Sequence, residues 1–204
     1  MEKLLGSLTK GLVFVISAPA GTGKTTLARM LMDEFPCISE SISCTTRPKR
    51  MGEIAEKDYH FLPKEDFEKK IKEKEFLEYA TVFGHHYGTL KSHVKEKLHQ
   101  GQHILLVIDT QGAMQLKKEK YPAVFIFIRP PSMGELRARL FNRKTEKEEH
   151  MEERLTWAKH EMDMAMEYDY IVTNDNLHRA FEILRSIFIS EEHKTKRYHD
   201  RNID

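Results

Sequence analysis

The feature that most constrains this fold is the apolar run "GLVFVIS" (11–17), which leads directly into the glycine-rich stretch "APAGTGKTT" (18–26). Continuous rather than alternating hydrophobicity is expected where helices cover both faces of a β-strand. The residues after the glycines, "KTTLARMLMDEF" (24–35), place apolar side chains at helical spacing. The sequence therefore predicts a buried strand, a tight loop and an amphipathic helix in succession.

The loop ends in Gly23-Lys24-Thr25, which matches the end of the phosphate-binding signature G-x-x-x-x-G-K-[ST]. In that signature, backbone N–H groups surround the phosphates, the lysine adds a mobile charge and the hydroxyl binds Mg²⁺. Ala18 stands at the first glycine position, and it changes little if its φ is negative, because alanine differs from glycine chiefly in avoiding positive φ. A turn that only reverses the chain is the alternative, but it leaves Lys24 and Thr25 unexplained. The loop residues predicted to contact ATP are Ala18, Pro19, Ala20, Gly21, Thr22, Gly23, Lys24, Thr25 and Thr26.

Strand-like and helix-like segments alternate along much of the chain. Two further apolar runs lie at 103–109 and 123–128, and a weaker one lies at 168–175. Amphipathic segments separate them, such as "SHVKEKLHQG", which ends at a glycine. This alternation predicts an α/β fold with a parallel sheet core and helices on both faces.

Two segments interrupt the alternation. Residues 39–90 contain short strand-like pieces around one charged helix, which predicts a small mixed sheet inserted in the core. Residues 132–167 are helical and heavily charged, which fits either a solvated helix surface or a lid. We expect a single domain over 1–204, whose core consists of 1–38, 91–131 and 168–204.

Composition limits the partners. The 33 Lys and Arg residues balance 32 Asp and Glu residues, so no overall basic field favours a nucleic acid polymer or a membrane surface. The two cysteines, Cys37 and Cys44, support neither a disulfide framework nor a zinc site. The first residues lack a basic leader, and their apolar run of about seven residues is too short to span a bilayer. We expect a cytoplasmic protein with small-molecule substrates, and a homodimer stays open.

Two stretches, "SISCTTRPKRMGEIAEKDYHF" and "EFLEYATVFGHHYGT", closely resemble the monophosphate-binding insertion of bacterial-type guanylate kinases, which transfer a phosphoryl group from ATP to GMP. The resemblance runs from about Val13 to about Ala180 and includes "IDTQGA", "RLFNRKTEKEEHMEERL" and "TND". That family also tolerates alanine at the first loop position. The resemblance implies a P-loop nucleoside-monophosphate-kinase fold, in which 39–90 binds GMP, 132–167 forms a helical lid and Mg²⁺ accompanies ATP.

The resemblance also implies a guanine pocket and a site for the GMP phosphate. Glu78 in "FLEY" would accept the ring N–H and amino hydrogens of guanine, a donor pair that adenine lacks. Arginine forks and tyrosine hydroxyls suit phosphate oxygens. Singly, these tyrosines also fit half-buried strand aromatics and the arginines fit loop charges, but their joint occurrence in family order favours binding. The residues implied to bind GMP are Ser43, Arg47, Arg50, Tyr59, Glu78, Tyr87 and Thr89.

Asp109 ends the apolar run "HILLVID", at the edge where open parallel sheets place ligand sites. The resemblance implies that Asp109 and Thr25 hold Mg²⁺, Asp109 through water. A carboxylate that caps the next helix is the alternative reading of Asp109. The family commonly has an acidic residue two positions earlier, where this chain has Val107.

The lid segment is implied to supply arginines to the phosphates in transit, because phosphoryl transfer spreads charge over the equatorial oxygens. Arg143 and Arg154, and less directly Arg139, match the family pattern. Asn174 in "TND" is implied to contact the adenine of ATP, although asparagine before aspartate also suits a turn. The catalytic residues that the resemblance implies are Lys24, Arg47, Arg143 and Arg154.

Two other functions compete with this one. An enzyme that keeps the ATP loop but uses another phosphorylated acceptor is disfavoured by Ser43, Glu78, Tyr59 and Tyr87. A scaffolding domain that binds phosphorylated peptides and has lost the ATP loop is disfavoured by the intact loop. Nucleotide affinity separates the last alternative from the kinase, because a scaffold should bind ATP feebly.

Overall fold

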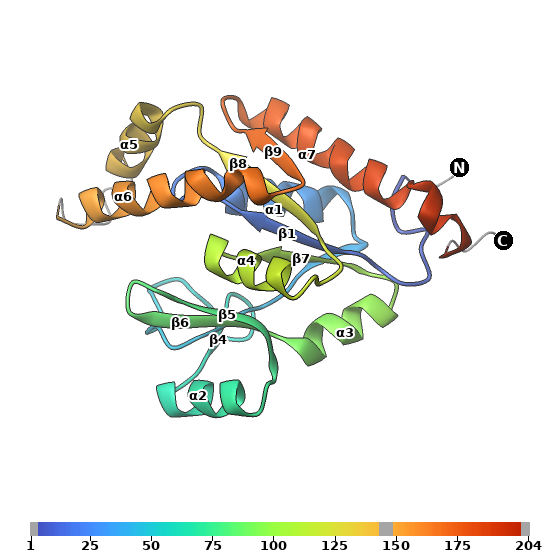
Figure 1. Ribbon diagram of the computed structural model, residues 1–204, viewed down its shortest axis with the longest axis horizontal. Helices are drawn as coiled ribbons and strands as arrows, with labels where there is room; N and C mark the ends of the chain where they lie inside the picture. The colour runs from blue at the N-terminus through green and yellow to red at the C-terminus, as the bar shows by residue number, and fades with distance from the viewer. Residues whose placement is uncertain (1–3, 143–148, 201–204) are drawn as a thin grey trace.

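The computed structural model describes residues 4–142 and 149–200 and contains two β-sheets (Figure 1). The larger sheet has five strands, and every neighbouring pair in it is parallel. In spatial order these strands are β2 (Ile38–Glu40), β7 (His103–Val107), β1 (Val13–Ser17), β8 (Val124–Arg129) and β9 (Tyr170–Thr173).

Helices cover both faces of this sheet, because alternate residues of each strand point to opposite faces. Phe14 and Ile16 of β1 pack in a cluster with helices α1 (Lys24–Glu34) and α7 (Leu177–Glu192). Val13 and Val15 pack in a second cluster with α3 (Lys91–His99) and α4 (Thr110–Lys118). Both faces are buried, so the strand has no polar face and its sequence is a continuous apolar run. Burying each large aliphatic side chain stabilises the fold by about 1.5–3 kcal/mol.

The smaller sheet is mixed and lies below the larger one in Figure 1. β3 pairs parallel with β4 and antiparallel with β6, and β6 pairs antiparallel with β5. Helix α2 (Lys64–Lys72) packs Phe67 on Phe76 with ring centroids 4.4 Å apart. The strands are β3 (Cys44–Thr45), β4 (His60–Phe61), β5 (Phe76–Val82) and β6 (His85–Leu90).

The stretch "SESISCTT" (39–46) divides between the two sheets. Its first residues belong to β2, which pairs Ile38 with His103 of the core sheet. Its last residues belong to β3 of the small sheet. A parallel core with helices on both faces and a separate small mixed sheet are therefore confirmed, and β2 adds an edge strand to the core.

Helices α5 (Met133–Asn142) and α6 (Glu149–Asp163) pack on each other through Leu136, Leu155 and Ala158. The chain then passes through a 3-10 turn, η1 (Met164–Glu167), into β9. No helix among residues 4–142 and 149–200 is long and apolar enough to cross a membrane.

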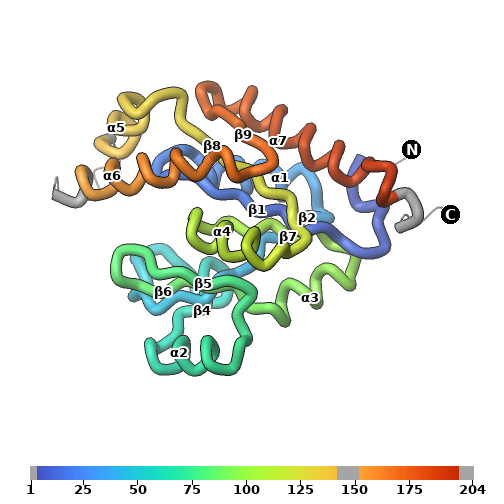
Figure 2. Tube along the Cα trace, in the orientation of Figure 1, coloured from blue at the N-terminus to red at the C-terminus, as the bar shows by residue number. Residues whose placement is uncertain are grey.

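The first described residues run alongside the end of α7 (Figure 2). Glu192 is fully buried there and accepts hydrogen bonds from the backbone N–H groups of Gly6 and Ser7, each at 2.9 Å. The Nε2 of His103 lies 2.6 Å from the same carboxylate, and its Nδ1 accepts from the Leu12 N–H. A single buried carboxylate therefore joins both ends of the described chain to β7. The last element is a 3-10 turn, η2 (Thr195–Asp200).

Candidate active site

The loop between β1 and α1 has the backbone that its sequence predicts. Gly21 and Gly23 have φ values of 88° and 92°, where side chains are disfavoured. Ala18 is not among the described residues with positive φ, and its side chain is buried in the core, so the condition under which alanine can replace the glycine is met. The alanine therefore removes no conformation that this loop uses.

The first turn of α1 leaves its N–H groups available to an anion. The helix begins at Lys24, directly after Gly23, which has no side chain to cap it. The next two residues, Thr25 and Thr26, are exposed. A helix N-terminus without a cap carries unpaired donors and a partial positive charge, and both suit phosphate.

Asn174 holds this loop from beneath. It is 5% exposed, and its Nδ2 donates to the Thr22 carbonyl at 2.7 Å. A β-carbon on Gly23 would lie 2.5 Å from that Nδ2, so the glycine also makes room for the asparagine. The predicted contact of Asn174 with adenine stays a prediction. Its hydrogen bond to the Thr22 carbonyl is a structural contact that the sequence did not suggest.

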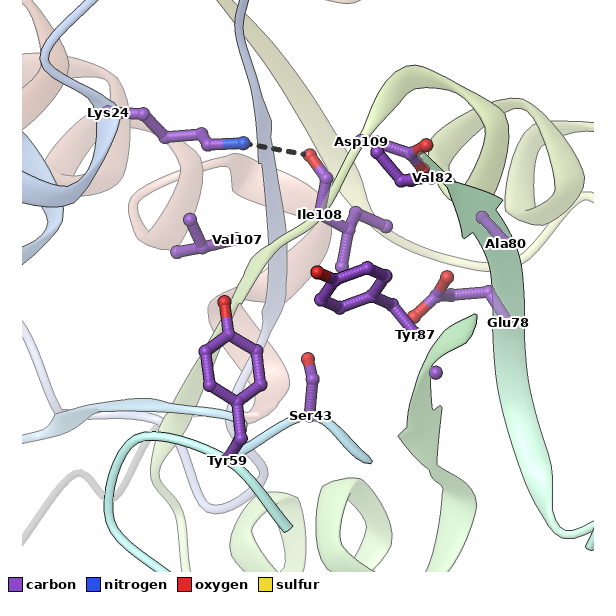
Figure 3. A pocket seen from close by; sticks show the side chains of 11 residues that line it. Lys24, Ser43, Tyr59, Glu78, Ala80, Val82, Tyr87, Val107, Ile108 and Asp109 are labelled. Carbon is purple, nitrogen blue, oxygen red and sulfur yellow. Dashed lines mark hydrogen bonds between the residues drawn. The ribbon is translucent and has the colours of Figure 1, made fainter. Parts of the chain in front are cut away.

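A cavity of about 210 Å³ opens between the two sheets (Figure 3). It brings together three segments that are distant in sequence: the phosphate loop, the small sheet and the end of β7. Of the residues predicted to bind GMP, four line it, and both Lys24 and Asp109 do so as well. The complete lining is Lys24, Ser43, Tyr59, Glu78, Ala80, Val82, Tyr87, Gly88, Val107, Ile108 and Asp109.

Glu78 is the buried carboxylate of this cavity. It is 2% exposed, and the Thr89 hydroxyl donates to its Oε1 at 2.6 Å. Burial raises the pKa of Glu78 from 4.5 to about 7, although the Thr89 hydrogen bond opposes the shift. Because this hydrogen bond orients the Glu78 carboxylate, its remaining lone pairs have a fixed direction, which suits a ligand that presents two N–H donors. Thr89 was predicted to lie near the guanine base. In this structure Thr89 is fully buried and its hydroxyl donates to Glu78.

Two tyrosines form an aromatic wall of the cavity, which Ser43 also lines (Figure 3). The rings of Tyr59 and Tyr87 lie 6.1 Å apart. The Arg47 guanidinium carbon lies 5.3 Å from the Tyr59 ring centroid. Both tyrosine hydroxyls reach the cavity, so the wall offers neutral donors next to a cation.

Arg47 is held by a residue that the sequence did not single out. Its two terminal nitrogens donate to the two oxygens of Glu53 at 3.0 and 2.7 Å. This fork raises the pKa of Arg47 further above its ordinary value. The Arg50 side chain is exposed and does not line the cavity, although its backbone N–H also donates to Glu53 at 2.8 Å. The sequence contained a signal for this contact, since Glu53 is an acidic residue that follows Arg47 and Arg50 within six positions.

Lys24 extends across the loop toward the end of β7. Its ammonium group donates to the Ile108 carbonyl at 3.4 Å (Figure 3). Burial lowers the pKa of Lys24, and the negative charges of Glu161, Asp109 and Glu40 oppose this shift. No carboxylate of the described residues forms an ion pair with Lys24. A desolvated cation in such a position is favourable for binding phosphate, because the phosphate supplies the opposite charge.

Asp109 caps helix α4, which is the structural reading that the sequence left open, and its role toward Mg²⁺ stays a prediction. Its Oδ1 caps α4 by accepting the Gly112 N–H at 3.0 Å, and its Oδ2 accepts from Gln111 Nε2 at 3.0 Å. Burial raises its pKa, and these hydrogen bonds oppose the shift. The same carboxylate lines the cavity, with the apolar Val107 beside it in place of an acid.

Glu161 on α6 is a further buried acid near the loop, and sequence reasoning missed it within the charged helical stretch. It is 5% exposed, and burial raises its pKa to about 7 against the opposing charge of Lys24. Its neighbours Ala158 and Ala165 are buried as well. Helical spacing from these alanines is the signal that would have placed Glu161 on the inner face.

The arginines that were predicted for the lid differ in their surroundings where the structure describes them. Arg139 bonds Glu135 at 2.9 Å and the Asn174 carbonyl at 3.1 Å, beside the phosphate loop. The Arg154 guanidinium lies 5.5 Å from the Phe83 ring centroid, at the tip of the β5–β6 hairpin. Arg143 lies outside the described residues.

Comparison with known proteins adds independent support. The family model described as guanylate kinase matches residues 10–191. A guanylate kinase of Protochlamydia amoebophila is 50% identical over 189 residues, which cover 93% of this chain and 95% of that protein. One from Thermotoga maritima is 45% identical over 192 residues, which cover 94% and 93%.

A solved structure is similar over the same length. The crystal structure of guanylate kinase from Anaplasma phagocytophilum has a TM-score of 0.77 to this chain at 34% identity, and covers 96% of this chain and 92% of its own. The family match spans the phosphate loop, the cavity between the sheets and helix α6. Sequence, site geometry and relatives agree, and this chain belongs to the guanylate kinase family.

Proposed function

We propose that this protein catalyses ATP + GMP ⇌ ADP + GDP with Mg²⁺. An oxygen of the GMP phosphate attacks the γ-phosphorus of ATP, and the bond from that phosphorus to the bridging oxygen of ADP breaks. The enzyme forms no covalent intermediate. The observation that carries the proposal is the shared cavity, which the buried Glu78 carboxylate and the Lys24 ammonium both line.

Guanine is selected by Glu78. Its carboxylate accepts the ring N–H and the amino group of guanine, while Ser43 bonds another part of the base edge. Adenine would leave the buried carboxylate without these two donors, and an unpaired buried polar group costs about 1–3 kcal/mol or more when charged. Thr89 acts through Glu78, because its hydroxyl fixes one carboxylate oxygen.

The GMP phosphate is bound by the tyrosine hydroxyls and by Arg47, with Arg50 joining from the exposed loop. After the bonds of Arg47 to Glu53 and the Pro48 carbonyl, two of its five N–H hydrogens remain, and they face the side of Tyr87, with which Arg47 also interacts. Glu53 therefore orients the guanidinium and leaves donors for a second anion. In this proposal residues 39–90 form the GMP-binding part of the protein.

The ATP phosphates are bound by the loop amides and Lys24. Thr25 and Asp109 fit Mg²⁺, because a hydroxyl and a carboxylate are hard oxygen donors, and this ion is held by one or two protein oxygens together with substrate phosphates and water. The ion would neutralise charge on the β- and γ-phosphates. Asp109 is oriented for this role by Gln111 and the Gly112 N–H.

Residues 132–167 act as the lid in this proposal. Closure brings Arg154 and Arg143 to the transferred group and excludes water, which would otherwise accept the phosphoryl group. The contact of Leu140 with Gly21 supports it, since a β-carbon on Gly21 would lie 3.0 Å from Leu140 Cδ2. Asn174 contributes to the ATP side by supporting the loop.

The test is an ADP-release assay across a panel of monophosphate acceptors. We expect turnover with GMP and at least about 10²-fold lower kcat/KM with AMP, CMP and UMP. A Lys24→Ala preparation run in parallel reports contaminating kinase. Equal rates with AMP and GMP would refute the assignment of Glu78, and absence of turnover with every acceptor would refute the kinase.

A further inference from the structure

The tip of the β5–β6 hairpin has an unusual residue. Phe83 and Gly84 form its two-residue turn, and both have positive φ, at 47° and 78°. Such turns favour asparagine, aspartate and glycine, because other side chains are strained there. A phenylalanine in this conformation that is also 46% exposed gains little from burial, so its ring points to another role.

The ring of Phe83 meets helix α6. Its centroid lies 6.4 Å from that of Trp157, and the Arg154 guanidinium lies 5.5 Å from it. Arg154 and Trp157 are three residues apart, so they share one face of the helix. A cation over an aromatic face and a tilted aromatic pair are both attractive geometries. One ring thus contacts two side chains of the lid helix.

The same hairpin carries the base-reading residue. Glu78 pairs with Thr89 across the hairpin, and Val82 pairs with His85 next to the turn. Phe83 lies five positions after Glu78, or roughly 17 Å along an extended strand. Continuous pairing along this length makes the hairpin a stiff connection from the guanine pocket to the lid.

The hairpin is also braced midway against α4. The Tyr79 N–H donates to Gln115 Oε1 at 3.1 Å, and Gln111 Nε2 donates to the Thr81 carbonyl at 3.1 Å. Gln111 donates to Asp109 as well. The strand therefore has a fixed support between its two functional ends.

We propose that Phe83 is a positioning residue, which holds Arg154 and Trp157 of the lid helix at the end of the GMP-binding hairpin and so couples occupation of the guanine pocket to delivery of Arg154. The inference rests on the proposed function, and it adds a direct link between acceptor site and lid. Phe83 touches no substrate. It acts through Arg154.

The variant Phe83→Gly separates the ring from its backbone, because glycine keeps the positive φ and removes the side chain. We expect kcat to fall about tenfold, while the KM for GMP stays within about threefold. Phe83→Tyr retains the ring and should restore kcat to within about twofold. Ile183→Ala removes a similarly exposed apolar side chain from α7, outside the loop, the hairpin and the lid, and serves as the control, with kcat unchanged.

Trp157 supplies a readout that is independent of turnover, since it is the single tryptophan of the chain. Without nucleotide, its emission should shift to longer wavelength in Phe83→Gly, because the ring no longer shields it. Adding GMP should change the emission of the unaltered protein and of Phe83→Tyr, and that change should fall at least about threefold in Phe83→Gly. Thermal unfolding confirms that each variant is folded.

A double substitution tests the route through Arg154. In an Arg154→Lys background, Phe83→Gly should reduce kcat by less than about twofold, because residues that act as one unit are not additive. A tenfold effect in that background would overturn the role through Arg154. An unchanged kcat together with an unchanged fluorescence response would overturn the coupling, while turnover of GMP by the unaltered protein leaves the proposed function intact. Failure of the unaltered protein to phosphorylate GMP would instead count against the proposed function.

Discussion

Gly112 on α4 lies so close to Glu78 that a β-carbon at position 112 would be 2.2 Å from Glu78 Oε2. The helix backbone thus closes the cavity behind the carboxylate, on the side where we propose that guanine binds. Thr89 holds Oε1 from the other side. Glu78 is therefore fixed between a hydroxyl and a glycine, which is how a small sheet and a core helix together determine its direction.

Replacing Gly112 with alanine should displace Glu78 without altering the phosphate loop. We expect the KM for GMP to rise about tenfold or more, because the added methyl group would push the carboxylate out of the position in which Thr89 holds it. ATP affinity, measured by calorimetry, should stay within about twofold. Gly134→Ala is a matched control on helix α5, where a β-carbon would meet only Ser132 Oγ at 3.8 Å. Equal effects of the two substitutions would contradict the role of Gly112.

Replacing Glu78 with glutamine should separate activity from stability. The amide presents hydrogens to the guanine donors, so kcat/KM for GMP should fall about 10²–10³-fold. The unaltered protein should lose kcat/KM for GMP as the pH falls below about 7, since protonation of Glu78 removes an acceptor. Steady-state kinetics of both proteins from about pH 6 to about pH 9, a range that includes the pKa of Glu78, provide the check.

The same substitution should stabilise the protein without nucleotide. The pKa of Glu78 is raised from 4.5 to about 7, so the folded state binds more protons than the unfolded state between these values. Stability is therefore lost as the pH rises through this window, by up to about 3 kcal/mol above it. Glu78→Gln should unfold at higher urea concentration than the unaltered protein at about pH 8, and the difference should vanish near the lower pKa. A less stable variant at the higher pH would contradict the shifted pKa.

Replacing Lys24 with alanine should affect turnover far more than binding of GMP. The ammonium stabilises charge that grows on the transferred phosphoryl group, so kcat should fall by about 10³-fold or more. GMP affinity, measured by calorimetry, should change by less than about threefold, because we propose that the small sheet binds the base and its phosphate. Loss of GMP binding in this variant would place Lys24 on the acceptor instead.

Replacing Glu192 with glutamine should destabilise the fold in a pH-dependent way. The buried carboxylate has its pKa lowered from 4.5 to about 2; burial acts to raise it, and the hydrogen bonds from His103, Ser7 and Gly6 together outweigh that effect. Its contribution, about 1–3 kcal/mol, is present above the unfolded pKa and is lost as the pH falls from about 4.5 toward 2. Urea unfolding at neutral and at acid pH should show a gap between variant and unaltered protein that closes on acidification. Turnover at neutral pH should persist where both proteins are folded.

Much of the fold can be predicted from local sequence patterns. The run "GLVFVIS" followed by glycines and an amphipathic segment predicted a buried strand, a tight loop and a helix, and β1, the loop and α1 confirm all three. Strand and helix patterns along the rest of the chain likewise determined a parallel core, because periodicity reports which faces are covered. The motif residues of the loop were identifiable for the same reason, since they are contiguous.

Contacts between distant segments required the tertiary structure. Glu53 on Arg47, Gln111 on both Thr81 and Asp109, and the Asn174 amide under the loop depend on distances that no periodicity encodes. The division of "SESISCTT" between two sheets was decided by pairing with β7 and β6, since short strands carry too little pattern to choose a partner. The sequence alone determined that a phosphate loop precedes a helix and that the core is a parallel sheet. Packing decided that the Glu161 carboxylate lies near that loop and that the Phe83 ring contacts helix α6. The reason is that burial brings together charges and aromatic rings from separate parts of the chain.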